Sequence, residues 1–261
     1  EEYSTAGCRA VDAWLTKLEG YLESHSVGEL RELLERYELT LPVASFQGGL
    51  LHTQGEPRRL AWELFRRRIA LCRELKIGTI VVAFDVATSP SANSLGDQDL
   101  DRVFASMAEL AKVAAENEVR VAMEFQAESA LGNNLQTAVG VVSQIGNPWL
   151  GICLDAFHFY VGPSKTEDLG LLTRSNLFHV QLCDLADVPR EFASDRDRIL
   201  PGDGDIPLGP VIQRLRDIEY DQFVSVELLN PQLWCIPPRN LGEAALASLA
   251  RLLTPASQSG K

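Results

Sequence analysis

VRVAMEF at residues 119–125 is followed by NNLQTAVGVVSQI at 133–145 and then by WLGICLD at 149–155. The first and last of these runs are short and apolar, as in strands that are buried on both faces. The middle run repeats apolar residues three and four positions apart, which is typical of an amphipathic helix. A strand, a helix and a second strand in this order predict two parallel strands joined by a helical crossover.

The same alternation extends over the rest of the chain. Its 261 residues suit a (β/α)₈ barrel, also called a TIM barrel, which typically needs about 250 residues. We therefore expect an α/β fold of this kind, with one domain over residues 1–254 and a disordered tail at 255–261. The predicted strands lie at residues 11–15, 40–46, 79–84, 119–125, 149–155, 177–184 and 222–228.

These are seven strands, whereas a closed barrel of this kind has eight. The chain opens with EEYSTAGCRAV, which resembles the end of a helix that leads into a strand. We expect that the first strand lies upstream and is missing here, because an open sheet edge would leave backbone groups unpaired. An incomplete barrel, with another segment covering the gap, is the alternative.

Composition and charge narrow the possible partners. The net charge of −12 repels phosphate backbones, so we expect no nucleic-acid partner. No apolar run approaches the roughly 18 residues of a membrane span, so we expect no membrane partner. The five cysteines are scattered without a CxxC pair, which predicts reduced thiols in a cytoplasmic protein. A homo-oligomer is possible.

Four predicted strands end on residues that can bind a hard metal ion, at intervals of 31, 26 and 46 residues: Glu124, Asp155, Gln181 and Glu227. Such intervals match one or two βα units of about 30 residues each, so the four side chains fall at the same end of the barrel. Side chains alternate along a strand, and each of the four shares the inward face. Three carboxylates there would repel one another unless a cation lay between them. Oxygen ligands favour Mn²⁺ first and Mg²⁺ second, with Zn²⁺ or Co²⁺ as further options.

Other polar residues lie near the same end of the predicted barrel. His158 follows Asp155 by three residues and is a candidate for binding substrate. Arg198 precedes the turn-forming PGDG and is a candidate for gripping a substrate oxygen. His52, after an earlier strand, is a third candidate. His179 points into the barrel one layer lower, where we favour a hydrogen-bonded core role over metal ligation.

These motifs together resemble the xylose-isomerase-like TIM-barrel superfamily, which includes the sugar phosphate isomerases and epimerases. The resemblance is carried by AMEF, LDAFH, HVQLCD, RILPGDGDIPL and SVELLNPQLW. The epimerase branch uses Glu, Asp, His and Glu as metal ligands, which match Glu124, Asp155, Gln181 and Glu227. A glutamine at the third position resembles instead the hydroxypyruvate isomerase and 3-dehydroshikimate dehydratase branches.

The resemblance implies a divalent-metal-dependent isomerase or epimerase that acts on a small keto-sugar or sugar acid through an enediolate. Glu124 and Glu227 would then form the acid/base pair, while His158 and Arg198 would hold substrate oxygens. One alternative is a metal-dependent dehydratase of a cyclic polyol ketone, such as an inosose or dehydroshikimate. Another is a binding barrel without catalysis. The related DNA-repair endonuclease uses a His-rich site, which four histidines in an acidic chain do not favour.

Overall fold

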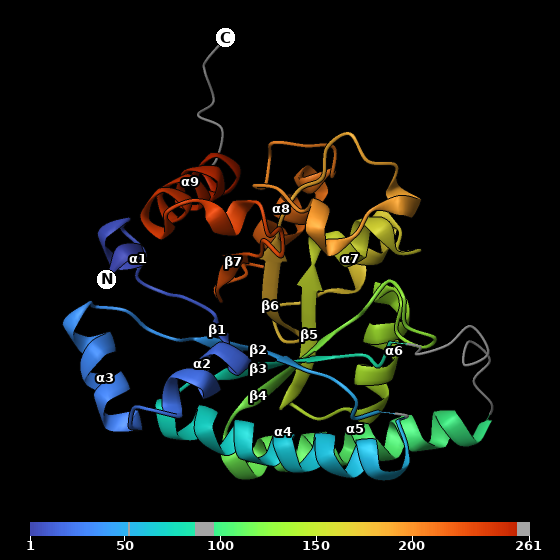
Figure 1. Cartoon of the computed structure of the whole chain (residues 1–261). Coiled ribbons are helices and arrows are strands. Elements are labelled where there is room, and N and C mark those ends of the chain that lie inside the picture. Colours follow the sequence, from blue (N-terminus) through green and yellow to red (C-terminus); the bar gives the residue numbers. More distant parts are fainter. Residues whose placement is uncertain (52, 87–96, 255–261) are drawn as a thin grey trace.

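A seven-stranded parallel sheet forms the centre of the protein, in the order β1-β2-β3-β4-β5-β6-β7. The computed structural model describes residues 1–51, 53–86 and 97–254. Helices surround the strands (Figure 1). The strands are β1 Ala13–Trp14, β2 Val43–Gln47, β3 Thr79–Ala83, β4 Arg120–Glu124, β5 Leu150–Asp155, β6 Leu177–Leu182 and β7 Val224–Val226.

Helices follow the strands, as the periodicity predicts. α3 begins at a capping box formed by Ser26 and Glu29, and α6 ends where Gly146 adopts a left-handed backbone. The helices are α1 Glu2–Thr5, α2 Leu15–Leu22, α3 Val27–Arg36, α4 Gly55–Leu75, α5 Asp97–Asn117, α6 Leu135–Ile145, α7 Ala156–Val161, α8 Leu208–Asp217 and α9 Pro238–Leu253. Short 3₁₀ turns lie at Thr166–Leu171, Arg190–Phe192, Asp195–Asp197 and Leu233–Cys235.

The predicted α/β order and all seven strands are confirmed. β1 is shorter than predicted, because Leu15 is the first residue of α2 and does not end a strand. β7 is also short, and Glu227 directly follows it, with its backbone N–H donating to the carbonyl of Leu182. In the described residues β1 and β7 are the two edges of the sheet, and an upstream strand stays a prediction.

Two further predictions cannot be compared with the fold, since His52 and the tail at 255–261 lie outside the described residues. The extent of the domain, 1–254, also stays a prediction. Within the described ranges, no helix combines the length and the apolar character needed to cross a membrane.

Apolar side chains fill both sides of the sheet. Most of the core lies between strands and helices, and a smaller cluster inside the barrel consists of Val43, Val81, Ala122, Cys153 and Phe178. The register between β5 and β6 shifts at Ile152/Cys153. Phe178 thus packs against Gly151, which has no side chain to obstruct the ring. This contact sets the spacing of two strands that end at the candidate site.

Gly151→Ala is expected to lower the free energy of unfolding by about 1–3 kcal/mol, the usual cost of overpacking a core. An added Cβ would lie 2.6 Å from ring atoms of Phe178 and 2.7 Å from the backbone oxygen of Asn176. Gly140→Ala, in the middle of α6, is the control because nothing lies within 4 Å of its Cβ position. It is expected to be neutral or stabilising by up to about 1 kcal/mol. Equal urea midpoints for the two variants would contradict this account.

Candidate metal and active site

A cavity of about 360 Å³ opens at the carboxyl ends of the strands. This is the end at which barrels of this type build their active sites. The elements that reach it come from widely separated parts of the sequence. Its polar lining includes Asp12, Glu124, His158, Gln181, Arg198 and Glu227.

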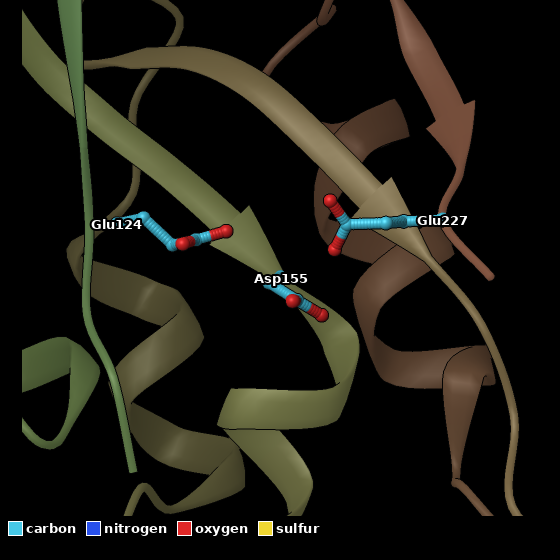
Figure 2. A group of neighbouring side chains, drawn as sticks. All are labelled: Glu124, Asp155 and Glu227. Carbon is cyan, nitrogen blue, oxygen red and sulfur yellow. The ribbon is translucent and has the colours of Figure 1, made fainter. Parts of the chain in front are cut away.

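Three carboxylates meet in this cavity. Glu124 is the last residue of β4, Asp155 is the last of β5, and Glu227 follows β7. Oxygen atoms of the three lie within 4.8 Å of one another, and Figure 2 shows the side chains pointing toward a common centre. The sequence prediction that these three strand ends converge is therefore confirmed as geometry, while their role as metal ligands stays a prediction.

Burial makes two of the three carboxylates, Glu124 and Glu227, unusually hard to ionise. Desolvation raises the pKa of Glu124 well above its usual value, and the charges of Glu227 and Asp155 raise it further. Desolvation also raises the pKa of Glu227 to about 8, although Arg198 acts in the opposite direction. Two carboxyls with raised pKa values in one cavity are typical of a functional site.

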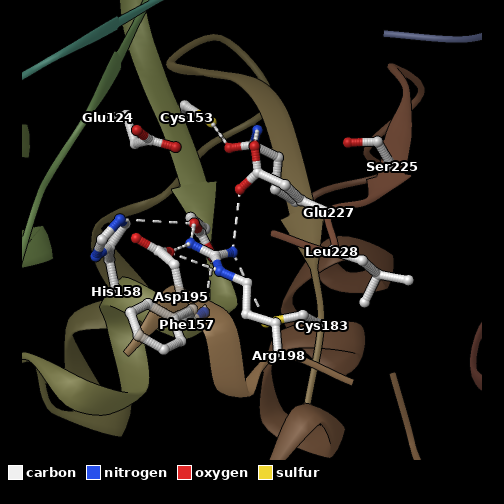
Figure 3. A network of polar contacts seen from close by, with 12 residues as sticks. Glu124, Cys153, Phe157, His158, Cys183, Asp195, Arg198, Ser225, Glu227 and Leu228 are labelled. Carbon is white, nitrogen blue, oxygen red and sulfur yellow. Dashed lines mark hydrogen bonds and ion pairs between the residues drawn. The ribbon is translucent and has the colours of Figure 1, made fainter. Parts of the chain in front are cut away.

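Arg198 supplies the positive charge closest to this group. Its guanidinium is only 1 % exposed and donates from Nη2 to Asp155 at 2.8 Å and from Nη1 to Glu227 at 3.0 Å. Nε donates to Asp195 at 2.9 Å, as Figure 3 shows. Burial alone would raise the pKa of Asp155, but the charge and hydrogen bonds of Arg198, together with His158 and the backbone N–H of Phe157, outweigh it and the net shift is downward. The predicted substrate contact of Arg198 stays a prediction.

The loop that carries Arg198 is held by Asp184. Backbone hydrogen bonds of 2.9 Å join Asp184 and Ile199 in both directions. The Asp184 carboxylate accepts from the backbone N–H of Gly202 at 2.9 Å and of Ile206 at 2.8 Å. A side chain on Gly204 would lie 2.2 Å from the carbonyl oxygen of Leu185, so this position requires glycine. The PGDG turn thereby folds Arg198 back over the cavity.

Gln181 lies beside Glu227 in the cavity wall. Its Nε2 donates to Glu227 at 2.7 Å, and its Oε1 accepts from the thiol of Cys153 at 3.0 Å. Gln181 is 1 % exposed. The fourth predicted ligand is thus next to the carboxylate group, with its amide shared between two neighbours.

The residues present fit a divalent metal ion. The buried carboxylates of Glu124 and Asp155 and the partly exposed carboxylate of Glu227 lie beside one guanidinium among the described lining residues, so one divalent charge would offset the surplus of negative charge. Carboxylate oxygens suit Mn²⁺ or Mg²⁺ best. Glu124, Asp155 and Glu227 would hold the ion. Gln181 lies beside them with its Oε1 on Cys153 and its Nε2 on Glu227, so its role as a ligand stays a prediction.

His158 lines the cavity next to Asp155, and its Nε2 lies 3.8 Å from Oδ2 of Asp155. Its Nδ1 accepts a hydrogen bond of 3.4 Å from the backbone N–H of Ala127, so the ring proton is on Nε2. Burial lowers the pKa of His158, although the charge of Asp155 opposes this shift. A neutral imidazole therefore presents an N–H donor near the carboxylates.

His179 has the core role that the sequence favoured. It is fully buried, and its Nε2 lies 2.8 Å from Oδ2 of Asp12 and 3.0 Å from Oγ of Ser225. Sequence reasoning missed Asp12 and Ser225, and it also missed Gln126, which donates to Glu124. The sequence did contain a signal for Gln126. It lies two residues beyond Glu124, and residues two apart in an extended chain point to the same face.

Relatives with known names match much of the chain. The inosose isomerase of Bacillus velezensis is 28% identical over 224 residues, which cover 84% of this chain and 78% of that protein. The D-psicose 3-epimerase of Enterocloster bolteae is 29% identical over 131 residues, or 49% of this chain and 40% of that one.

The fold is also that of known barrels. The crystal structure of the IolI protein with a binding zinc atom superposes with a TM-score of 0.86 at 21% identity, over 97% of this chain and 90% of that one. The family model described as "Xylose isomerase-like TIM barrel" matches residues 1–252. The resemblance seen in the sequence motifs is confirmed, and the chain belongs to the xylose isomerase-like TIM barrel family.

Proposed function

We propose that this protein is a divalent-metal-dependent isomerase or epimerase of a small keto-sugar or sugar acid. The observation that carries the proposal is the approach of Glu124 and Glu227 from opposite walls of one cavity, with Asp155 between them (Figure 2). The names of the relatives, inosose isomerase and D-psicose 3-epimerase, support this class of reaction. The zinc atom in the IolI structure supports a divalent ion.

The two glutamates supply the proton transfers. When bound, the ion would polarise the substrate's carbonyl and the adjacent hydroxyl, which acidifies the neighbouring C–H. One glutamate takes that proton on a carboxylate oxygen and leaves an enediolate. Return of a proton to the adjacent carbon, with transfer of a hydroxyl proton between the two oxygens, gives the isomer, whereas delivery of a proton to the opposite face of the same carbon by the second glutamate gives the epimer. Burial raises the pKa values of both glutamates, and a bound divalent ion would lower them, which would leave one carboxylate to accept the substrate's proton.

The walls of the cavity favour a substrate without a phosphate group. Trp14, Phe46 and Trp234 line it, and each is at least 40 % exposed. Aromatic faces suit the C–H face of a sugar or cyclitol ring. Arg198, the one Arg or Lys among the described residues of the lining, is already bonded to carboxylates. We therefore favour an unphosphorylated substrate.

Oxygen donors make Mn²⁺ our first choice of ion and Mg²⁺ the second, with Zn²⁺ and Co²⁺ as further options. The five free cysteines support a reducing compartment such as the cytoplasm. His158 would donate from Nε2 to a substrate oxygen. No nucleic-acid partner is proposed, because the charge of −12 opposes it.

A dehydratase is the second candidate, and the residue that favours it is Gln181. A glutamine at this position resembles the 3-dehydroshikimate dehydratase branch. The first proton abstraction would be the same, but a β-hydroxyl would then leave with a proton from the second carboxyl. An unsaturated product that absorbs in the ultraviolet distinguishes this outcome from isomerisation.

Glu124→Gln and Glu227→Gln are each expected to reduce turnover about 10²- to 10⁴-fold, because an amide cannot exchange a proton. The assay is ¹H NMR in deuterated water with Mn²⁺ and a panel of keto-sugars, sugar acids and inososes. It follows both product formation and loss of the C–H signal. Glu116→Gln, an exposed glutamate on α5, is the matched control. Full turnover by either site variant would rule out its acid/base role.

Removal of metal and readdition of Mn²⁺ should reveal a coupled proton release. The pKa of Glu227 is raised to about 8 and that of Glu124 is also raised, so at neutral pH an incoming ion must displace protons. Apparent affinity should therefore rise with pH, by up to about tenfold per unit for each displaced proton, and flatten once both carboxyls are ionised. Calorimetry in buffers of different ionisation enthalpy measures the release. Glu227→Gln should release fewer protons, and an affinity independent of pH would contradict the prediction.

A further inference from the structure

Each of the two proposed acid/base glutamates accepts a hydrogen bond from a glutamine amide. Gln181 Nε2 donates to Oε1 of Glu227 at 2.7 Å, and Gln126 Nε2 donates to Oε2 of Glu124. Both glutamines line the cavity. Gln126 and Glu124 therefore form the same kind of pair as Gln181 and Glu227. Gln126 lies just outside the AMEF motif, so the sequence motifs did not point to it.

The carboxylates of Glu227 and Glu124 differ in the number of hydrogen-bond donors that contact them. Oε2 of Glu227 accepts from Nη1 of Arg198 at 3.0 Å, so both of its oxygens are engaged. In the described part of the chain, Gln126 is the one hydrogen-bond donor to the Glu124 carboxylate. The terminal torsion of a glutamate is broad and has no strong preference of its own. The orientation of the Glu124 carboxylate thus depends on Gln126.

Gln126 is itself held in a tight turn after β4. Its backbone N–H donates to Gly132 at 3.1 Å, and its carbonyl accepts from the N–H of Ser129 at 2.8 Å. Ser129 is buried. Ala127, which follows Gln126, donates its backbone N–H to Nδ1 of His158. A side chain on such a fixed turn can present its amide in one direction.

We propose that Gln126 is a positioning residue for proton transfer by Glu124, an inference that rests on the proposed function. The amide holds Oε2 as an acceptor and leaves Oε1 to take the substrate's proton and return it. A carboxylate held in one orientation spends more of its time in the reactive geometry. Since the amide of Gln126 is bonded to Glu124, we expect its loss to affect the chemical step more than substrate binding.

Gln126→Met tests this, because methionine has a similar length and no N–H donor. At saturating Mn²⁺ we expect kcat for C–H exchange to fall about 10- to 100-fold, with KM and the midpoint of thermal unfolding close to those of the wild type. Gln136→Met, at an exposed position of α6, is the matched control and should behave as wild type.

A double-mutant cycle separates positioning from a general structural role. If Gln126 acts through Glu124, then Gln126→Met should change the residual exchange of Glu124→Gln by less than about twofold, but should still slow Glu227→Gln. Equal losses in both backgrounds at saturating Mn²⁺ would overturn the proposal. Wild-type rates in Gln126→Met would overturn it while leaving the proposed function intact. Absence of exchange in the wild type with the whole substrate panel would overturn both.

Discussion

Electrostatic repulsion among three neighbouring carboxylates is the constraint on which the rest of the site depends. Glu124 and Asp155 are buried and Glu227 is partly exposed, and oxygen atoms of the three lie within 4.8 Å of one another. Like charges in such a partly buried site interact more strongly than in bulk solution. Arg198 offsets part of this repulsion through contacts with Asp155 and Glu227. The long loop before α8 therefore has a structural task, since Asp184 folds it so that its arginine reaches the carboxylates.

Burial is the main reason that Glu124 and Glu227 resist ionisation, and the negative charge that one guanidinium leaves unneutralised adds to it, whereas the pKa of Asp155 is lowered. Asp155 makes two hydrogen bonds to Arg198 and a third to the backbone of Phe157, so its charge is well compensated and its pKa falls. Glu124 has no cation in contact among the described residues. The same surplus of negative charge that helps to raise the pKa values of the two glutamates would also attract a divalent ion.

The sequence predicted the strands and their polar ends because both signals are local. A buried strand is a short apolar run, and a carboxylate at its end stands out, as in AMEF and GICLD. The partners of Arg198 were not predictable, because they depend on how Asp184 folds a loop of more than 20 residues. Asp12 pairs with His179, which lies 167 positions away, and no periodicity links residues at that distance. β1 was predicted too long because an apolar Leu15 fits a strand and the start of α2 equally well.

Gln181 bears on the charge balance of the predicted metal site but does not decide which reaction follows. An amide is uncharged and does not titrate, so at this position it leaves the charge balance of the three carboxylates unchanged, whereas a histidine would add a titratable group. Its oxygen and nitrogen face Cys153 and Glu227 respectively, so it orients the carboxylate of Glu227, which is one of the two proposed acid/base groups. In the proposed mechanism, the fate of the enediolate depends on two features outside the predicted ligand set. They are the carbon that the second glutamate reaches and the presence of a β-hydroxyl on the substrate.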